Sequence, residues 1–236
     1  MSVAPPWRRL LAELVGTALL VTAVVGSGIM ASTLSPHDAG LELLENSIAT
    51  AFALGALILV LGPVSGAHFN PVVSAADWLL GRRTRSGLTA RQLGGYVLAQ
   101  ITGAIAGSVL ANLMFALPAV HWSGRQRAAG HLWLGETVAT AGLILVVFAL
   151  ARSGRAAAAP AVVGSYIGAA YWYTSSTSFA NPAVTIGRAF TDTFAGIAPS
   201  SVPGFLLAQL AGLAAGVGLL LALYPAAHTL RKDLPP

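Results

Sequence analysis

The sequence contains no cysteine, which excludes disulfide bonds, thiolate metal sites and cysteine nucleophiles. It also has little charge: 9% of its 236 residues are charged, against about a quarter in an average soluble domain. This shortage excludes an ordinary soluble globule, a disordered chain and a nucleic-acid-binding surface. Apolar side chains, in contrast, make up 56% of the chain, and 26 residues are glycine. A chain of this composition belongs in a lipid bilayer.

Six hydrophobic stretches are candidates for helices that cross the bilayer, which takes about 20 residues each. They run over residues 10–32, 46–63, 96–117, 132–151, 158–173 and 205–224. The fifth is marginal in length. The first is too long for a signal peptide, contains Glu13 and is followed by five similar stretches. The sequence therefore predicts an all-α membrane protein with six transmembrane helices.

Basic residues predict the orientation of these helices, because lysine and arginine gather on the cytoplasmic side. With a cytoplasmic N-terminus, three arginines lie outside, namely Arg125, Arg127 and Arg188. The other ten of the 13 basic residues then lie inside: Arg8, Arg9, Arg82, Arg83, Arg85, Arg91, Arg152, Arg155, Arg231 and Lys232. We expect a multi-pass protein of the cell inner (plasma) membrane with both termini in the cytoplasm.

An internal repeat relates residues 8–118 to residues 131–226. A Glu-x-x-small-Thr pattern at 13–17 recurs at 136–140, and Leu-Ala-Gln at 98–100 recurs at 207–209. An Asn-Pro pair follows the second stretch and again the fifth. Because each half holds three crossings, an odd number, the halves lie in opposite orientations across the membrane. We expect one channel domain, residues 1–236, with an inverted repeat and a site near the membrane midplane.

The two pairs, Asn70-Pro71 and Asn181-Pro182, each precede only about ten apolar residues, which end at Gly81 and Thr191. Asparagine favours the N-cap of a helix and proline its first turn. A ten-residue helix crosses only half of the hydrocarbon layer. The sequence thus predicts two re-entrant half-helices that meet at their N-termini. Their positive ends would repel cations, and the asparagine amides would offer N–H donors to a neutral solute.

Over essentially its whole length the sequence resembles the aquaporin and aquaglyceroporin family. The two Asn-Pro-Ala boxes of that family match Asn70-Pro71-Val72 and Asn181-Pro182-Ala183. Val72 is a departure, which adds two methyl groups where the half-helices abut. The resemblance implies an aquaporin-like fold of six spans and two half-helices, a pore in every protomer, a homotetramer in membrane lipid, and passive flux without a coupling ion.

The selectivity filter implied by the resemblance departs further from the family. The residue after the second box, arginine in most members, is Val184 here. Counting from the boxes places the other filter positions at Thr50, Ala169 and Ser178, and a two-residue shift would replace Ala169 by Tyr171. A filter of Thr50, Ala169, Ser178 and Val184, all small or uncharged, predicts a wide and rather apolar constriction.

Arg188 offers a possible replacement for the missing filter charge. It lies four residues after Val184, about one turn and 6 Å along the same helix face. Its guanidinium could fold over the outer pore mouth, or it could pair with Asp192, again four residues on, and stay off the pore.

Three further polar residues lie where polar groups are costly. Glu13 and Glu136 occupy matching places within predicted spans, and we expect them to accept hydrogen bonds from the loops before the half-helices rather than to relay protons. His68 either holds its loop or lines the inner vestibule. No spacing of His, Asp or Glu resembles a metal or hydrolase site, so we expect no metal, no cofactor and no enzyme.

The sequence resembles a bacterial branch of the family that often lacks the filter arginine and is associated with arsenic resistance. We expect a passive channel for water and small uncharged solutes: glycerol-like polyols, neutral metalloids or methylated arsenicals. A water-selective pore is one alternative, which the small filter residues disfavour. A coupled secondary transporter is another, but only Glu13 and Glu136 could serve as its titratable groups. The last alternative is a non-conducting membrane-junction protein that has the same fold.

Overall fold

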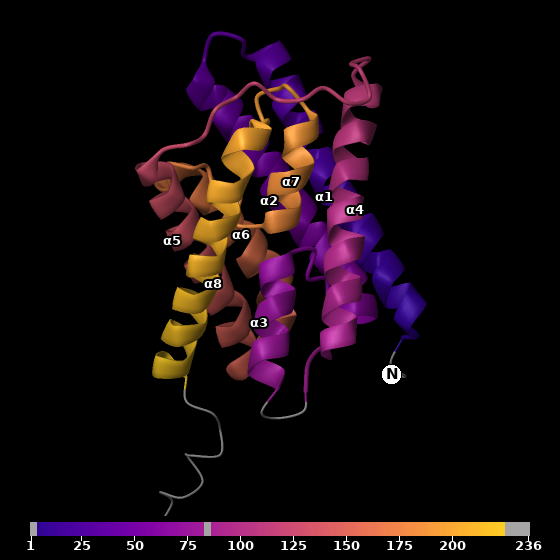
Figure 1. The fold of residues 1–236 in the computed structure, drawn as a ribbon, viewed down its shortest axis with the longest axis vertical. Coiled ribbons are helices and arrows are strands. Elements are labelled where there is room, and N and C mark those ends of the chain that lie inside the picture. The colour runs from indigo at the N-terminus through magenta and orange to yellow at the C-terminus, as the bar shows by residue number, and fades with distance from the viewer. Residues whose placement is uncertain (1–3, 83–85, 225–236) are drawn as a thin grey trace, which may run out of the picture.

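The computed structural model describes residues 4–82 and 86–224, and in those residues it holds eight α-helices and no strand. Six helices are long: α1 (Pro6–Leu34), α2 (Ala39–Ser65), α4 (Ala90–Met114), α5 (Gly130–Arg152), α6 (Ala159–Tyr173) and α8 (Val202–Leu223). The two short helices, α3 (Pro71–Gly81) and α7 (Pro182–Gly187), lie one above the other among them (Figure 1). The order of two long helices, a short one and a long one therefore occurs twice, as the repeat predicts.

Among the residues that the structure describes, five stretches are long and apolar enough to cross a membrane: α1, α2, α4, α5 and the run Pro199–Leu223, which contains α8. α6 has only 15 residues, in line with the marginal fifth stretch, and a 3₁₀ turn, Ala156–Ala158, precedes it. α2 and α4 begin six or seven residues earlier than hydropathy predicts. The reason is polar capping, by Asp38 before α2 and by a Thr89–Gln92 capping box at α4.

The two half-helices differ at their C-terminal ends. α3 ends at Gly81, as predicted. α7 is a six-residue α-helix that passes into a 3₁₀ turn, Arg188–Phe190, so the second half-helix ends just before Thr191. Gly187 keeps α-helical dihedrals, φ −58° and ψ −42°, so Arg188 still follows the helix, and the chain departs from it only beyond Arg188, whose ψ is −9°.

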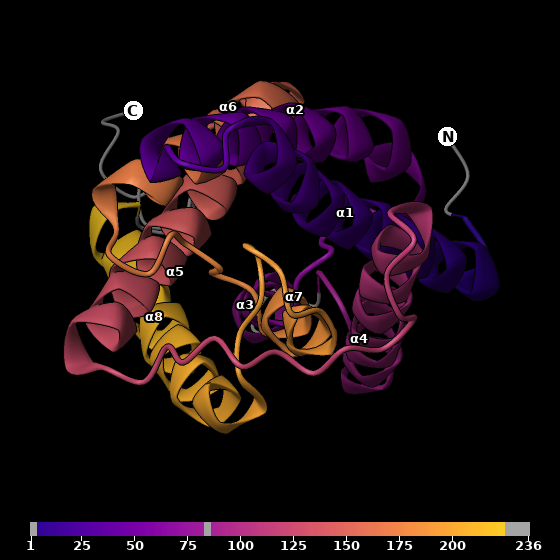
Figure 2. The ribbon, with the colours of Figure 1, turned by 90° about the horizontal axis from the view of Figure 1, so that it is seen from above.

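Seen from above, the long helices surround the two half-helices (Figure 2). Within each half the first and last helices pack closely, α1 on α4 and α5 on α8. Glycines permit this: a Cβ added at Gly103 or Gly107 would lie 2.3 Å from a carbonyl oxygen of α1, and one at Gly212 or Gly216 would lie 2.6 Å from one of α5. The small-residue rows thus bring helices together inside one protomer.

The start of α1 and the end of α8 lie at the same end of the molecule, the lower end in Figure 1. Six of the basic residues expected in the cytoplasm belong to the described part of the chain. The other four, Arg83, Arg85, Arg231 and Lys232, lie outside the described residues, as do the last two residues of the expected second repeat.

Candidate functional site

Each half-helix begins at an asparagine that caps it. Asn70 Oδ1 accepts a hydrogen bond from the N–H of Val72 at 3.0 Å. Asn181 Oδ1 accepts from the N–H groups of Ala183 and Val184, at 3.0 and 3.2 Å. These bonds hold both side chains rigidly at the junction of the two helices.

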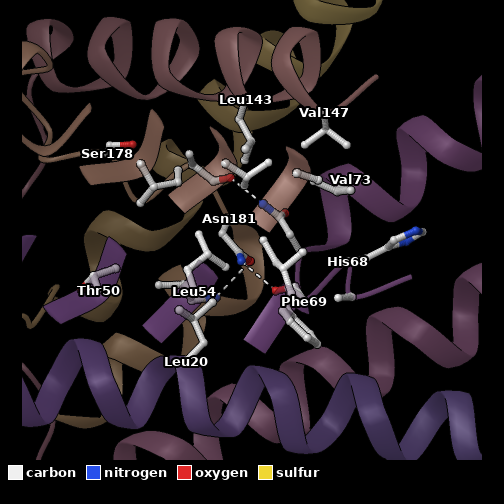
Figure 3. Close-up of a pocket in the computed structure, with 18 of the residues that line it drawn as sticks. Leu20, Thr50, Leu54, His68, Phe69, Val73, Leu143, Val147, Ser178 and Asn181 are labelled. Carbon is white, nitrogen blue, oxygen red and sulfur yellow. Dashed lines mark hydrogen bonds between the residues drawn. The ribbon is translucent and has the colours of Figure 1, made fainter. Parts of the chain in front are cut away.

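The same two side chains tie the halves of the molecule together. Asn70 Nδ2 donates to the carbonyl of Ala180, and Asn181 Nδ2 donates to that of Phe69, both at 2.8 Å (dashed lines in Figure 3). Each carbonyl belongs to the residue just before the other asparagine. One amide hydrogen of each asparagine is thereby used, and the second remains for a ligand.

A fully buried glutamate supports each loop that leads into a half-helix. Glu13 accepts from the backbone N–H groups of residues 68 and 69, at 3.0 and 2.7 Å. Glu136 accepts from those of residues 179 and 180, both at 2.8 Å. This is the arrangement expected from their matching positions. The carboxylates are satisfied by the loops themselves, as a buried charge requires.

A glutamine completes each of these networks. Gln100 Nε2 donates to Glu13 at 2.8 Å and to Ser74 Oγ at 2.9 Å. In the second half Gln209 Nε2 donates to Glu136 at 2.6 Å and to the Thr185 hydroxyl at 2.8 Å. Glutamate, half-helix and last helix are thus joined in the same way in both repeats.

The loops need this support because their backbones are strained. Ala67 and Phe69 in the first loop, and Ser178 and Ala180 in the second, have φ values between 48° and 51°. Non-glycine residues in this left-handed region cost about 1–3 kcal/mol each. Such strain persists only where surrounding contacts hold it, here the bonds to the buried glutamates.

A cavity of ≈ 250 Å³ runs past the two capped helix ends. Along α6 its lining extends from Ala159 to Tyr171, twelve residue steps or about 18 Å. The described part of α4 and α8 contributes no lining residue, so the path lies on the other side of the half-helices. Its walls are mainly aliphatic (Figure 3): Leu20, Val24, Leu54, Ile58, Val73, Leu143, Val147, Val163, Ile167 and Val184.

The structure brings many of the predicted site residues to this cavity. The lining includes Thr50, His68, Asn70, Tyr171, Ser178, Asn181, Val184 and Arg188. Others support it without lining it: Glu13, Pro71, Val72, Glu136, Pro182 and Ala183. Val72 is buried in the first turn of α3, so its two extra methyl groups are accommodated by packing.

The fifth span contributes Tyr171 to the cavity and not Ala169. Tyr171 is buried, and its hydroxyl lies 3.1 Å from Thr50 Oγ1. Ala169 is exposed on the outside of α6 and does not line the cavity, so its expected place there is wrong. Ala169 and Tyr171 are two positions apart on α6 and so lie on different faces of the helix, which means that an error of two residues in counting exchanges one face for the other.

Arg188 lies against the cavity and not against Asp192. Its side chain is 2% exposed, its Nε donates to the carbonyl of Ala195, and its guanidinium carbon is 3.4 Å from the centroid of the Phe179 ring. Asp192 instead accepts from the N–H of Gly124 at 3.0 Å. The alternative in which the two side chains pair is wrong.

His68 combines both of its expected roles. It lines the lower part of the cavity, and its Nδ1 lies 3.0 Å from Ser74 Oγ on α3. Its ring also meets Tyr96 edge-on, with centroids 5.4 Å apart.

Asp77 is a lining residue that the sequence reasoning missed. It faces the lower end of the cavity, and its Oδ2 accepts from the N–H of Leu88 at 2.7 Å. The helix period carried a usable signal, because Asp77 follows Val73 by four residues on one face of α3.

Comparisons with known proteins place the chain in a family and identify proteins that it resembles. The model of the Major intrinsic protein family matches residues 1–178. The chain is 50% identical over 229 residues to the aquaglyceroporin AqpS of Rhizobium meliloti (strain 1021), covering 97% of this chain and 95% of that protein. It is 31% identical over 225 residues to the glycerol uptake facilitator protein of Pseudomonas aeruginosa, covering 82% and 77%. The solved aquaglyceroporin from Plasmodium falciparum shares the fold, with a TM-score of 0.70 and 20% identity over 98% of this chain and 100% of that one.

Proposed function

Because this chain belongs to the major intrinsic protein family, whose aquaglyceroporins are membrane channels and not enzymes, we propose that it passes small uncharged solutes and water passively. The observation that carries this proposal is the elongated cavity with two capped asparagines at its centre. A polyol can place its hydroxyl oxygens on the free asparagine N–H groups and its carbon chain on the aliphatic wall.

The residues at the upper end of the cavity support a glycerol-sized permeant. Val184 stands where most family members carry arginine, and it presents an apolar side chain there, while the charge at this end is that of Arg188, four residues further on. Thr50 of α2 and Tyr171 of α6 supply hydroxyls to the same cavity. A relative of 31% identity is a glycerol uptake facilitator, which favours glycerol over a purely aqueous pore. Neutral metalloids and methylated arsenicals, with similar hydroxyl groups, are further candidate permeants.

Stopped-flow light scattering on proteoliposomes tests this function. After a hyperosmotic step with glycerol we expect fast shrinkage followed by re-swelling faster than in empty liposomes. Fast shrinkage without accelerated re-swelling would contradict the proposal and favour a water-selective pore. If glycerol passes, the same assay with arsenous acid and with a methylated arsenical decides between the remaining solutes.

A coupled transporter is the weaker candidate. Its mechanism would need titratable groups that exchange ions along the path, and neither Glu13 nor Glu136 lines the cavity. His68 and Asp77 do line it, but at its lower end, where they contact Ser74 Oγ and the N–H of Leu88 and not the central asparagines. Glycerol flux that does not change with an imposed proton or sodium gradient is therefore expected.

We also propose a homotetramer in the inner membrane with both termini in the cytoplasm. A groove between α2 and α6, beside the exposed Phe52 and lined by Gly55, Pro160 and Gly164, offers an apolar face to a neighbouring copy. Native mass measurement should give about four times the 24.0 kDa of one chain.

The cysteine-free chain also permits a test of orientation: Ala128→Cys should react with an impermeant maleimide added outside cells, and Ala157→Cys only after permeabilisation.

A further inference from the structure

Three arginines gather beside the upper end of the cavity, and we call Arg125, Arg127 and Arg188 the outer arginine cluster. Each donates to a carbonyl of the segment 194–196. Arg125 Nη1 binds the carbonyl of residue 194 at 2.9 Å, Arg188 Nε binds that of residue 195, and Arg127 Nε binds that of residue 196 at 3.0 Å. The three guanidinium groups therefore bind the carbonyl oxygens of three consecutive residues.

The cluster has no carboxylate of its own in residues 4–82 and 86–224. Asp192, the acidic residue nearest to Arg188 in the sequence, accepts from Ser123 Oγ at 3.4 Å and from the N–H of Gly124 at 3.0 Å. The hydrogen-bond acceptors of the cluster are neutral carbonyls. Glu136 attracts Arg127 and Arg188 electrostatically, but its hydrogen bonds go to the N–H groups of residues 179 and 180 and to Gln209, so the charge of the cluster is only partly compensated. A buried charge without a counter-ion is electrostatically costly.

Of the three arginines, Arg188 is the one for which burying the guanidinium charge costs most. Its side chain is 2% exposed and lines the cavity. Only its Nε has an acceptor among the described residues, so Nη1 and Nη2 remain for a ligand. Burial first, and then the charges of Arg188 and Arg125, lower the pKa of Arg127 to about 9, and the carboxylate of Glu136 opposes this shift only in part.

We propose that the outer arginine cluster is a binding site for a small, singly charged oxyanion of the carboxylate or sulfonate type, held by Nη1 and Nη2 of Arg188. The planar guanidinium matches two oxygens of such a group, and the binding is charge-assisted. Arg127 acts as a positioning residue: its guanidinium carbon lies 5.1 Å from the centroid of the Phe179 ring, against which Arg188 also packs.

The immediate surroundings suit an anion with a small apolar group. The Phe179 ring and Val184 offer apolar contact, and the Tyr171 hydroxyl is within the same lining. Ser178 Oγ is buried and has no partner in the described part of the chain, so it is a spare hydrogen-bond donor at this end. The consequence for transport rests on the proposed function: a bound anion narrows the mouth and slows neutral solutes.

Methanesulfonate is the probe, because it stays ionised at every working pH and has no neutral form that crosses lipid. Its binding to the purified full-length protein is measured by titration calorimetry. Its effect on glycerol flux is measured in proteoliposomes. We expect saturable binding and a matching, saturable decrease of flux. For Arg188→Gln, which keeps a neutral donor, we expect affinity weaker by about tenfold or more, the loss of a charge-assisted bond.

Three further variants sharpen the test. Arg188→Lys keeps the charge but loses the planar fork, and Arg127→Gln removes the positioning group; both should bind more weakly than the wild type. Arg155→Gln is the matched control, because Arg155 is exposed just beyond the opposite end of α5 and its side chain bonds only Ser153 among the described residues. It should bind methanesulfonate, and lose glycerol flux on binding it, like the wild type.

Absence of methanesulfonate binding by the wild type, or equal binding by the wild type and Arg188→Gln, would overturn the proposal. Water flux through Arg188→Gln shows that this variant is folded, and Arg188→Lys replaces it if it is not. Anion binding without any solute flux would refute the channel function but leave the anion site standing. Solute flux without anion binding would refute the anion site but leave the channel function standing.

Discussion

Glu13 is fully buried and accepts four hydrogen bonds, from Ser65 Oγ, Gln100 Nε2 and two backbone N–H groups of its loop. All four partners are donors. An acidic side chain therefore stabilises this loop in a way that no neutral side chain of the same shape can match, because bonds to a charged acceptor are stronger than neutral ones.

Replacing Glu13 by Gln should lower the free energy of unfolding by about 3 kcal/mol, since the new amide group would face other donors. Thermal unfolding in detergent measures this. Glu45→Gln is the control, because Glu45 is half-buried and accepts only from Ser35 among the described residues. Equal melting temperatures for the two variants would contradict the role given to Glu13.

Tyr171 lines the upper end of the cavity. Its replacement by Ala removes the ring and the hydroxyl 3.1 Å from Thr50 Oγ1, so polyols longer than glycerol should pass several-fold faster. Re-swelling of proteoliposomes in erythritol measures the effect. Ala169→Val, on the exposed side of the same helix, should leave the rates unchanged, and a larger effect at Ala169 would reverse this assignment.

At the scale of helices, each half is held by close contact between its first and last helix. A Cβ at Gly103 would lie 2.3 Å from the carbonyl oxygen of Leu14, a distance that forces α1 and α4 apart. The helices can approach this closely only because the contact residue has no side chain.

Gly103→Ala should therefore destabilise the protein by about 1–3 kcal/mol through overpacking. Gly94→Ala, in the same helix, is the matched control because a Cβ there meets nothing within 4 Å. It should leave the stability unchanged or raise it slightly through better helix propensity. Denaturation of both variants in detergent compares them, and a loss of stability at Gly94 of the same size would argue against the packing explanation.

At the scale of the whole molecule, two half-helices point their N-termini at one place. Each N-terminus carries about half a positive charge, and Asn70 and Asn181 link the two across the junction. The fold thus concentrates positive potential at the centre of the cavity, although no basic side chain from residues 4–82 or 86–224 lies at that centre.

Asn181→Asp should weaken this potential by placing a negative charge at the junction, and so raise proton or cation leakage. A pH-sensitive dye inside proteoliposomes under an imposed voltage measures the leak. Asn181→Ser keeps a good N-cap without the charge and is the control. Identical leakage through both variants would show that the helix termini are not the barrier.

Local patterns in the sequence were sufficient for the elements and the symmetry. Asn-Pro pairs specify helix starts chemically, the Glu-x-x-small-Thr pattern marks the repeat, and three crossings in each half require inversion. The start of α4 at Ala90 was missed because its capping box lies in polar sequence outside the hydrophobic stretch.

Which side chains meet across the molecule was decided by the tertiary structure alone. In an apolar span every face is apolar, so hydropathy could not tell Tyr171 from Ala169 as the residue on the cavity. The 3₁₀ turn after α7 and the loop that follows placed Arg188 on the carbonyl of Ala195 and not on Asp192. The same folding brought Arg125 and Arg127, over sixty residues away in the sequence, to that loop, because contacts over such distances depend on how the helices pack.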